Sequence, residues 1–178
     1  MMKRDALRPS LLLASALGLS LTATVGCSSF NRYEIPTTIC GRNIDPSALQ
    51  PLLPSGENFE ARPQISDDNQ ASCLIVVDKS AAFTISEIRN QSKFDVMEFA
   101  RKYPRRSSQN PRKSEIGADA VTSDRWLMSI NACTGHGRGD YYILDLDILD
   151  EGESKPKELE RFAQSYLPDA MKAMGCTE

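Results

Sequence analysis

The sequence predicts an α+β fold: an antiparallel sheet of four or five strands, with helices packed on one face and two disulfides. Apolar and polar residues alternate in several segments, which is typical of half-buried strands. Other segments carry apolar residues at i, i+3, i+4 and i+7, which is typical of amphipathic helices. Four cysteines between residues 40 and 176 are the third observation, because two cross-links stabilise a domain of this size.

Each predicted element has its own signal. Asp45 before Pro46 indicates a helix start, since Asp is a good N-cap and Pro suits the first helical position. Pro104 ends a helix that begins after a capping box at residues 92–95. In chain order, we expect a short helix after Asp45, strands over 73–77 and 83–88, a helix over 96–103, strands over 118–121, 126–132 and 142–148, and a last helix ending at Gly175.

The first residues have the order of a secretory signal. Lys3, Arg4 and Arg8 give a basic start, and an apolar run from Leu11 to Val25 follows. The run is shorter than the ~20 residues that a membrane-spanning helix needs. We therefore expect a cleaved signal peptide at residues 1–26 rather than a membrane span or a core helix.

The end of this run, Thr24-Val25-Gly26-Cys27, resembles a bacterial lipobox, in which small residues precede a cysteine that receives lipid and becomes the new N-terminus. Thr24 departs from the pattern, in which Leu is usual there, and ordinary cleavage near Ala23 is the alternative. The chain has five cysteines, and an odd number leaves one to explain in an exported protein. Lipid on Cys27 would leave four that can pair fully, so we expect a lipid-anchored protein on the extracytoplasmic face of the cell membrane.

The four other cysteines are Cys40, Cys73, Cys133 and Cys176. They allow three connectivities, among which the sequence alone does not choose. We favour Cys40–Cys73 and Cys133–Cys176, which pair neighbours along the chain and tie each end of the domain to a strand. Loops of that size contribute on the order of 3–4 kcal/mol each in the chain-entropy model. We expect a lipidated polar tether over 27–38 and a single α+β domain over 39–178.

The segment from Cys40-Gly41 through Asp45-Pro46 to the proline-rich stretch ending at Gly56 is similar to the start of small, uncharacterised secreted lipoproteins of actinobacteria. Those proteins show a lipobox, a Cys-Gly then Asp-Pro start, a strand with a second cysteine, and a last helix ending in Gly-Cys. The matching positions here are Cys27, Cys73, Gly175 and Cys176. The resemblance implies an exported location and disulfides, and it implies no activity.

The formal net charge is −3 at pH 7. Residues 1–26 carry three basic side chains and one acidic one, a net of +2, so the remainder carries −5. That is an ordinary soluble surface rather than one that binds polyanions overall. Nucleic acid is therefore not expected as a partner.

His136, the only histidine, lies in a Gly-rich stretch over residues 134–140 that predicts a hairpin loop. As a general base with Asp140 or a nearby serine, it would make the protein a hydrolase. We favour a solvated turn, and we assign no catalytic residue and no cofactor. A single histidine also excludes a metal site built on two histidines.

An acidic run covers residues 145–153, but Asp145 and Asp147 alternate with apolar residues and we interpret them as the solvent face of a strand. No spacing matches an EF-hand loop, so no metal site is expected. We place four aromatic residues in the core rather than in a ligand pocket: Trp126, Tyr141, Tyr142 and Tyr166.

Residues 101–113 contain six basic side chains and no acidic one: Arg101, Lys102, Arg105, Arg106, Arg112 and Lys113. A solvated loop is one interpretation, and contact with an anionic surface is the other. Membrane head groups attract each nearby Lys or Arg by about 1 kcal/mol, and anionic wall polymers would act likewise. Lipid on Cys27 would hold these side chains near such a surface, since one lipid signal often needs a second.

These observations favour a non-enzymatic envelope lipoprotein that binds an anionic envelope component or an unknown envelope protein. The first alternative is a small-ligand carrier with a pocket between the sheet and the helices. The second is the hydrolase built on His136.

Overall fold

The computed structural model describes residues 32–107, 109–134 and 141–176. The predicted signal peptide, Cys27, His136 and Asp140 lie outside these residues, and the predictions made for them stay predictions.

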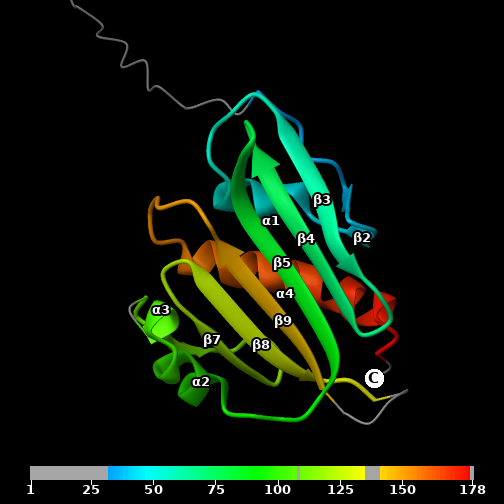
Figure 1. The fold of residues 1–178 in the computed structure, drawn as a ribbon, viewed down its shortest axis with the longest axis vertical. Coiled ribbons are helices and arrows are strands. Elements are labelled where there is room, and N and C mark those ends of the chain that lie inside the picture. The colour runs from blue at the N-terminus through cyan, green and yellow to red at the C-terminus, as the bar shows by residue number, and fades with distance from the viewer. Residues whose placement is uncertain (1–31, 108, 135–140, 177–178) are drawn as a thin grey trace, which may run out of the picture.

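A seven-stranded antiparallel sheet forms the centre of the molecule (Figure 1). In spatial order its strands are β3 (Phe59–Ser66), β4 (Gln70–Val77), β5 (Ser80–Gln91), β9 (Tyr141–Ile148), β8 (Trp126–Ala132), β7 (Asp119–Thr122) and β6 (Arg112–Ser114). Two meanders, β3 to β5 and β6 to β9, meet where β5 pairs with β9. Two short strands, β1 (Thr38–Ile39) and β2 (Arg42–Asn43), form a separate hairpin.

The prediction of an antiparallel α+β fold is confirmed, but the expected number of four or five strands was wrong. The sequence pattern missed β3 because Arg62, Pro63 and Gln64 interrupt its alternation, and the register of β3 with β4 shifts at Pro63. It missed β6 because three residues are too few for a period of two to be recognised.

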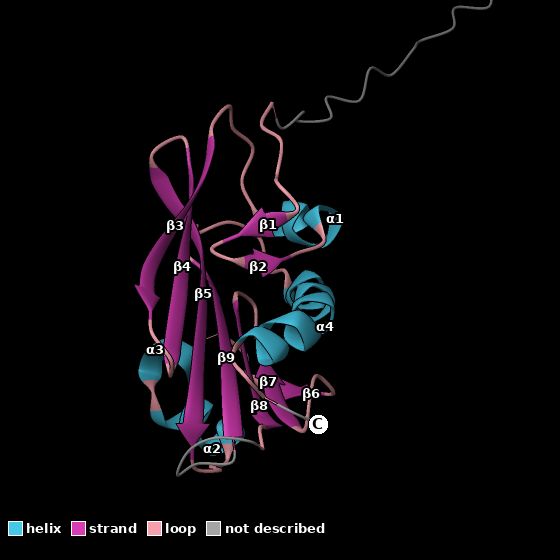
Figure 2. Ribbon diagram, turned by 90° about the vertical axis from the view of Figure 1, so that its right-hand side faces the viewer, coloured by secondary structure: helices cyan, strands magenta, loops and turns pink. Residues whose placement is uncertain are grey.

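The prediction that the helices pack on one face was also wrong, because helices cover both faces (Figure 2). On one face lie α1 (Pro46–Leu49), the 3-10 turn Gln50–Leu52 and α4 (Pro156–Ala173). On the other lie α2 (Val96–Lys102) and α3 (Pro104–Ser107). In the described segments, no helix is long and apolar enough to span a membrane.

Strand β8 shows why helices are needed on both faces of the sheet. Trp126, Met128 and Ile130 point to the α2 side and Leu127 to the α4 side, and all four are buried. A strand that is apolar on both faces must be covered on both. Val96 and Ala100 of α2 pack on the Trp126 side and form a core separate from the one under α4.

The core under α4 contains the apolar side chains that the sequence places on one face of this helix. Leu159, Phe162, Ala163, Tyr166 and Ala170 are all buried. The rings of Phe162 and Phe83 on β5 meet edge to face, with centroids 5.6 Å apart, a favourable arrangement for aromatic pairs. Pro168 lies within α4 without ending it.

Two disulfides close the fold. Cys40, between β1 and β2, bonds to Cys73 of β4, and Cys133, after β8, bonds to Cys176, after α4. These are the two pairs favoured in the sequence analysis. The first fixes the β1–β2 hairpin to the sheet, and the second fixes the end of α4 to the end of β8.

The segment expected to be a tether over residues 27–38 is folded in its second part. Tyr33 and Ile35 are buried in the core under α4. The Tyr33 hydroxyl donates to the Pro54 carbonyl at 2.7 Å, and the Arg32 amide donates to the Gly56 carbonyl at 3.0 Å. The folded part therefore includes residues 32–38 and does not begin at residue 39, because Tyr33 and Ile35 pack in the hydrophobic core.

Candidate functional site

Asp145 and Asp147 lie on the face of β9 that α3 covers, and they are not the solvent face that their alternation predicts. Asp147 is 7% exposed, and Asp145 is largely buried beside Trp126. Alternation in one strand shows that two side chains share a face, but it does not show which layer covers that face. The charges are therefore inside the α3 contact, where they need a cation.

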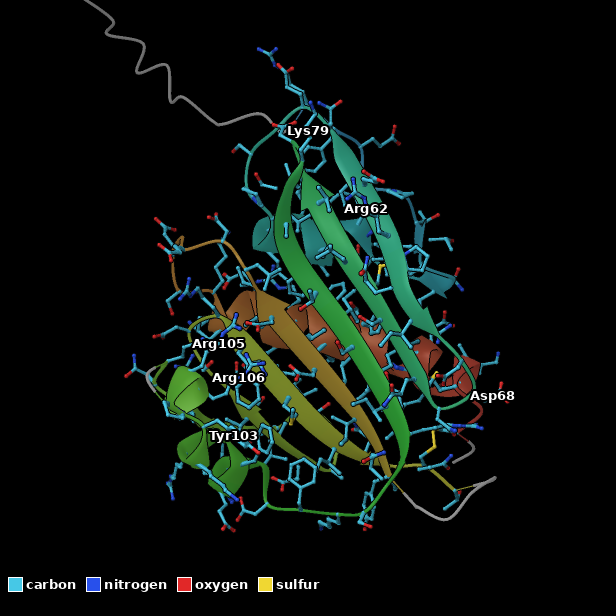
Figure 3. The ribbon with its side chains drawn as sticks, in the orientation of Figure 1. Arg62, Asp68, Lys79, Tyr103, Arg105 and Arg106 are labelled. Atoms are coloured by element: carbon cyan, nitrogen blue, oxygen red, sulfur yellow. A yellow bond between two sulfur atoms is a disulfide. The ribbon has the colours of Figure 1, made fainter. Side chains whose placement is uncertain are left out.

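Arg106 supplies that cation. Its side chain is 16% exposed, with Nη1 3.0 Å from Asp147 Oδ2 and Nη2 3.7 Å from Asp145 Oδ1. The guanidinium lies over the Trp126 ring, 4.6 Å from its centroid, a cation–π contact. Trp126 Nε1 donates to Asp145 Oδ1 at 2.7 Å. Figure 3 shows Arg106 reaching from α3 toward the strands.

Burial raises the pKa of Asp145 to about 6. Arg106 and the Trp126 hydrogen bond act against burial, whereas the neighbouring charge of Asp147 acts with it. The Arg106 cluster, which consists of Asp145, Asp147, Arg106 and Trp126, is thus a buried ion-pair arrangement that joins α3 to the sheet.

A second buried carboxylate lies on the opposite face of the sheet. Glu87 of β5 is 3% exposed. It accepts hydrogen bonds from the Tyr166 hydroxyl of α4 at 2.5 Å and from Arg42 of β2, whose Nη2 is 3.0 Å away. Burial and the nearby charge of Glu87 raise the pKa of Tyr166 and of Tyr142. Because Arg42 and Tyr166 already occupy the carboxylate, it joins three elements rather than presenting a base to a substrate.

The aromatic residues considered for a ligand pocket are core residues. Trp126, Tyr142 and Tyr166 are at most 1% exposed, and Tyr141 packs at the edge of the core under α2. Among the described residues, no group of three or more His, Cys, Asp or Glu side chains is placed to hold a metal ion.

The six basic residues of 101–113 are divided among three places. Arg101 and Lys102 are exposed on α2. Arg106 is ion-paired with Asp145 and Asp147. The Arg105 side chain is 71% exposed and lies 3.5 Å from Asp147. Arg112 and Lys113 are exposed on the edge strand β6. The predicted loop is therefore not one basic surface.

Arg112 and Lys113 instead join a groove between β6 and α4, with a volume of about 730 Å³. The β6–α4 groove is lined by Arg112, Lys113, Ser114, Glu115 and Ile116 on one side and by Lys157, Glu160, Arg161 and Gln164 on the other. The α4 residues are spaced as one helical face. Within the described part of the chain, none of the four groove cations forms an ion pair within 4.0 Å.

Sequence reasoning missed Lys157 and Arg161. Their spacing of four residues places them together on the polar face of α4, but only the fold brings that face beside β6. The chain matches no known protein-family model, no curated protein and no solved structure.

We predict that Arg106→Gln lowers the free energy of unfolding by about 3 kcal/mol near neutral pH, because it removes the buried cation that both carboxylates share. Urea denaturation measures this loss. The loss shrinks at about pH 5, where the variant's Asp145 is protonated. Arg105→Gln is the matched control and costs less than about 1 kcal/mol, since exposed pairs are weak. Equal losses for the two variants would contradict the assignment.

Asp145→Asn tests the raised pKa. The folded protein holds the Asp145 proton more tightly than the unfolded chain, so the stability from protonation is complete below about pH 4 and is lost as the pH rises through 6. The asparagine retains an oxygen for Trp126 and has no charge to bury. Between about pH 4.5 and 7.5 the wild type should lose on the order of 2 kcal/mol relative to the variant. Asp150→Asn, which changes an exposed carboxyl, is the control.

Proposed function

We propose that this chain is an exported lipoprotein, held on the extracytoplasmic face of the cell membrane by lipid on Cys27, and that it is a non-enzymatic binding module whose β6–α4 groove binds an anionic partner. The observation that carries the proposal is the convergence of Arg112, Lys157 and Arg161 on one groove, with Lys113 at its β6 edge, all without ion-pair partners in the described residues. Unpaired cations at a concave surface attract anions from solution.

The location has separate support. Two disulfides indicate an extracytoplasmic protein, because such bonds persist in oxidising compartments. They use four of the five cysteines. Cys27 is left over, at the position where the lipobox resemblance places the acylated residue.

The short connection to the anchor limits how far the point where the chain enters the fold can lie from the membrane. Arg32 is already hydrogen-bonded to the fold, and the five residues from Cys27 to Arg32 span at most about 18 Å. The chain enters beside the β4–β5 turn that carries Lys79, whereas β6, α2 and α3 lie in the other half of the molecule (Figures 1, 2 and 3). The groove therefore lies in the half of the domain distant from the attachment point, which favours an anionic partner beyond the head groups of the same bilayer.

The contacts between sheet and helix do not favour the small-ligand carrier. In the described residues, the space between α4 and the sheet is filled by side chains with no exposed surface, among them Phe83, Leu144 and Phe162. A carrier needs an apolar cavity in that place. A surface contact with a partner is the better interpretation.

Anchoring is tested by Cys27→Ser. The variant should leave the membrane fraction and accumulate as precursor or in the medium, because serine lacks the sulfur atom to which the lipid is attached. Metabolic labelling with a fatty acid should mark the wild type and not the variant. A processed, membrane-bound Cys27→Ser protein would refute the anchor.

The groove is tested by sedimenting the detergent-solubilised mature protein with detergent-insoluble cell envelope. Binding should weaken as salt rises, since salt screens exposed charges. Arg112→Gln with Arg161→Gln should reduce binding about tenfold. Arg101→Gln with Lys102→Gln removes the same charge from α2 and should leave binding unchanged. Loss of binding in the α2 variant alone would move the contact to that helix.

A further inference from the structure

We infer that the β6–α4 groove takes an extended, acidic segment of another envelope protein, which pairs with β6 as an additional strand of the sheet. This inference rests on the proposed function, since it names the partner of the same groove. It depends on the edge position of β6, on the placement of cations on both sides of that edge, and on the mixed charge of the groove.

Strand β6 is the last strand on its side of the sheet, and β7 pairs with one of its edges only. In the described residues, no backbone hydrogen bond joins its other edge to a further segment. The amide and carbonyl groups there can pair with an extended chain, which is the basis of strand addition. The α4 face beside β6 makes one wall of the groove in which that chain would lie.

The cations stand on both sides of this edge. Arg112 lies opposite Thr122 in the β6–β7 register, and Lys113 lies opposite Val121. Neighbouring residues of a strand point to opposite faces, and Val121 belongs to the core under α2. Arg112 therefore points to the α4 side, where Arg161 and its neighbours lie, and Lys113 points to the α2 side. An added strand would meet positive charge with both sets of its side chains.

The groove is not uniformly positive, because Glu115 and Glu160 lie among its four cations. A flexible polymer with a charge on every repeat would meet these carboxylates as well as the cations. A peptide places its acidic side chains at chosen positions and neutral ones opposite the carboxylates. The mixed charge therefore favours a peptide over a wall polyanion.

Two further groups in the groove suit a peptide. Ser114 Oγ is buried and has no hydrogen-bond partner among the described residues, so a rotation of this side chain into the groove would let it bond a polar group of the occupant. Ile116 is half-buried and packs at the edge of the core under α4. Together they give one polar and one apolar contact beside the charges.

The test is fluorescence anisotropy of a labelled eight-residue peptide of alternating Glu and Thr with the mature protein in detergent. We expect saturable binding that weakens about tenfold in Arg112→Gln with Arg161→Gln, and that is unchanged in Arg101→Gln with Lys102→Gln. The same peptide methylated on every internal amide keeps its charge but has no internal amide donor for the β6 carbonyls, and its methyl groups hinder close pairing with the strand. It should bind at least tenfold more weakly, and equal binding of the two peptides would overturn strand addition.

The envelope experiment separates this inference from the proposed function. Protease treatment of the envelope should abolish groove-dependent sedimentation if the partner is a protein segment. Sedimentation that survives protease, together with tighter binding to a poly(glycerol phosphate) than to the peptide, would overturn the peptide partner and leave the groove as an anion-binding surface. Sedimentation that is insensitive to the groove substitutions would overturn both.

Discussion

The contact of Arg106 with two buried carboxylates of β9 fixes the position of α3 in the second layer of the molecule. Asp145 and Asp147 occupy alternate positions of β9 and cannot remain charged under α3 without a cation. The position of Arg106 also determines that of Gln109, because the Gln109 amide donates to the Arg106 carbonyl. The Gln109 carbonyl in turn accepts from the Asp124 amide. This fixes the start of the segment that becomes β6. The exposed groove thus depends on an ion pair formed on the opposite face of the sheet.

Each face of the sheet contains a buried carboxylate cluster that joins distant parts of the chain. Glu87 brings Arg42 of the β1–β2 hairpin and Tyr166 of α4 to one point, and the acidic pair of β9 brings α3 to another. Buried ion pairs are weak evidence for stability, because desolvation offsets most of the attraction. The two partners of a buried ion pair must nevertheless be placed accurately, since a displaced partner leaves an uncompensated charge in the protein interior. We therefore regard both clusters as determinants of where the helices dock.

Much of the fold could be predicted, and the failures have a common cause. The favoured cysteine pairing is the one that forms, although the sequence alone leaves three connectivities open. The α4 stripe and the β8–β9 hairpin strands follow from local spacing. The burial of Asp145, the second cover on β8 and the packing of Tyr33 do not, because each depends on a segment distant in sequence. The groove illustrates the same limit: Arg112 was found as part of a basic run, but Arg161 joins it only through the docking of α4 beside β6.

Both walls of the groove are fixed independently of any partner. Strand β6 is held by its ladder with β7. Helix α4 is held by its buried stripe, and its far end is tied to β8 by the Cys133–Cys176 bond. A partner that binds there need not order the protein, so its binding energy is not reduced by that cost. The cost falls on the occupant, and a chain that is already extended loses the least conformational freedom. A preformed groove beside an edge strand is therefore best matched by an extended segment.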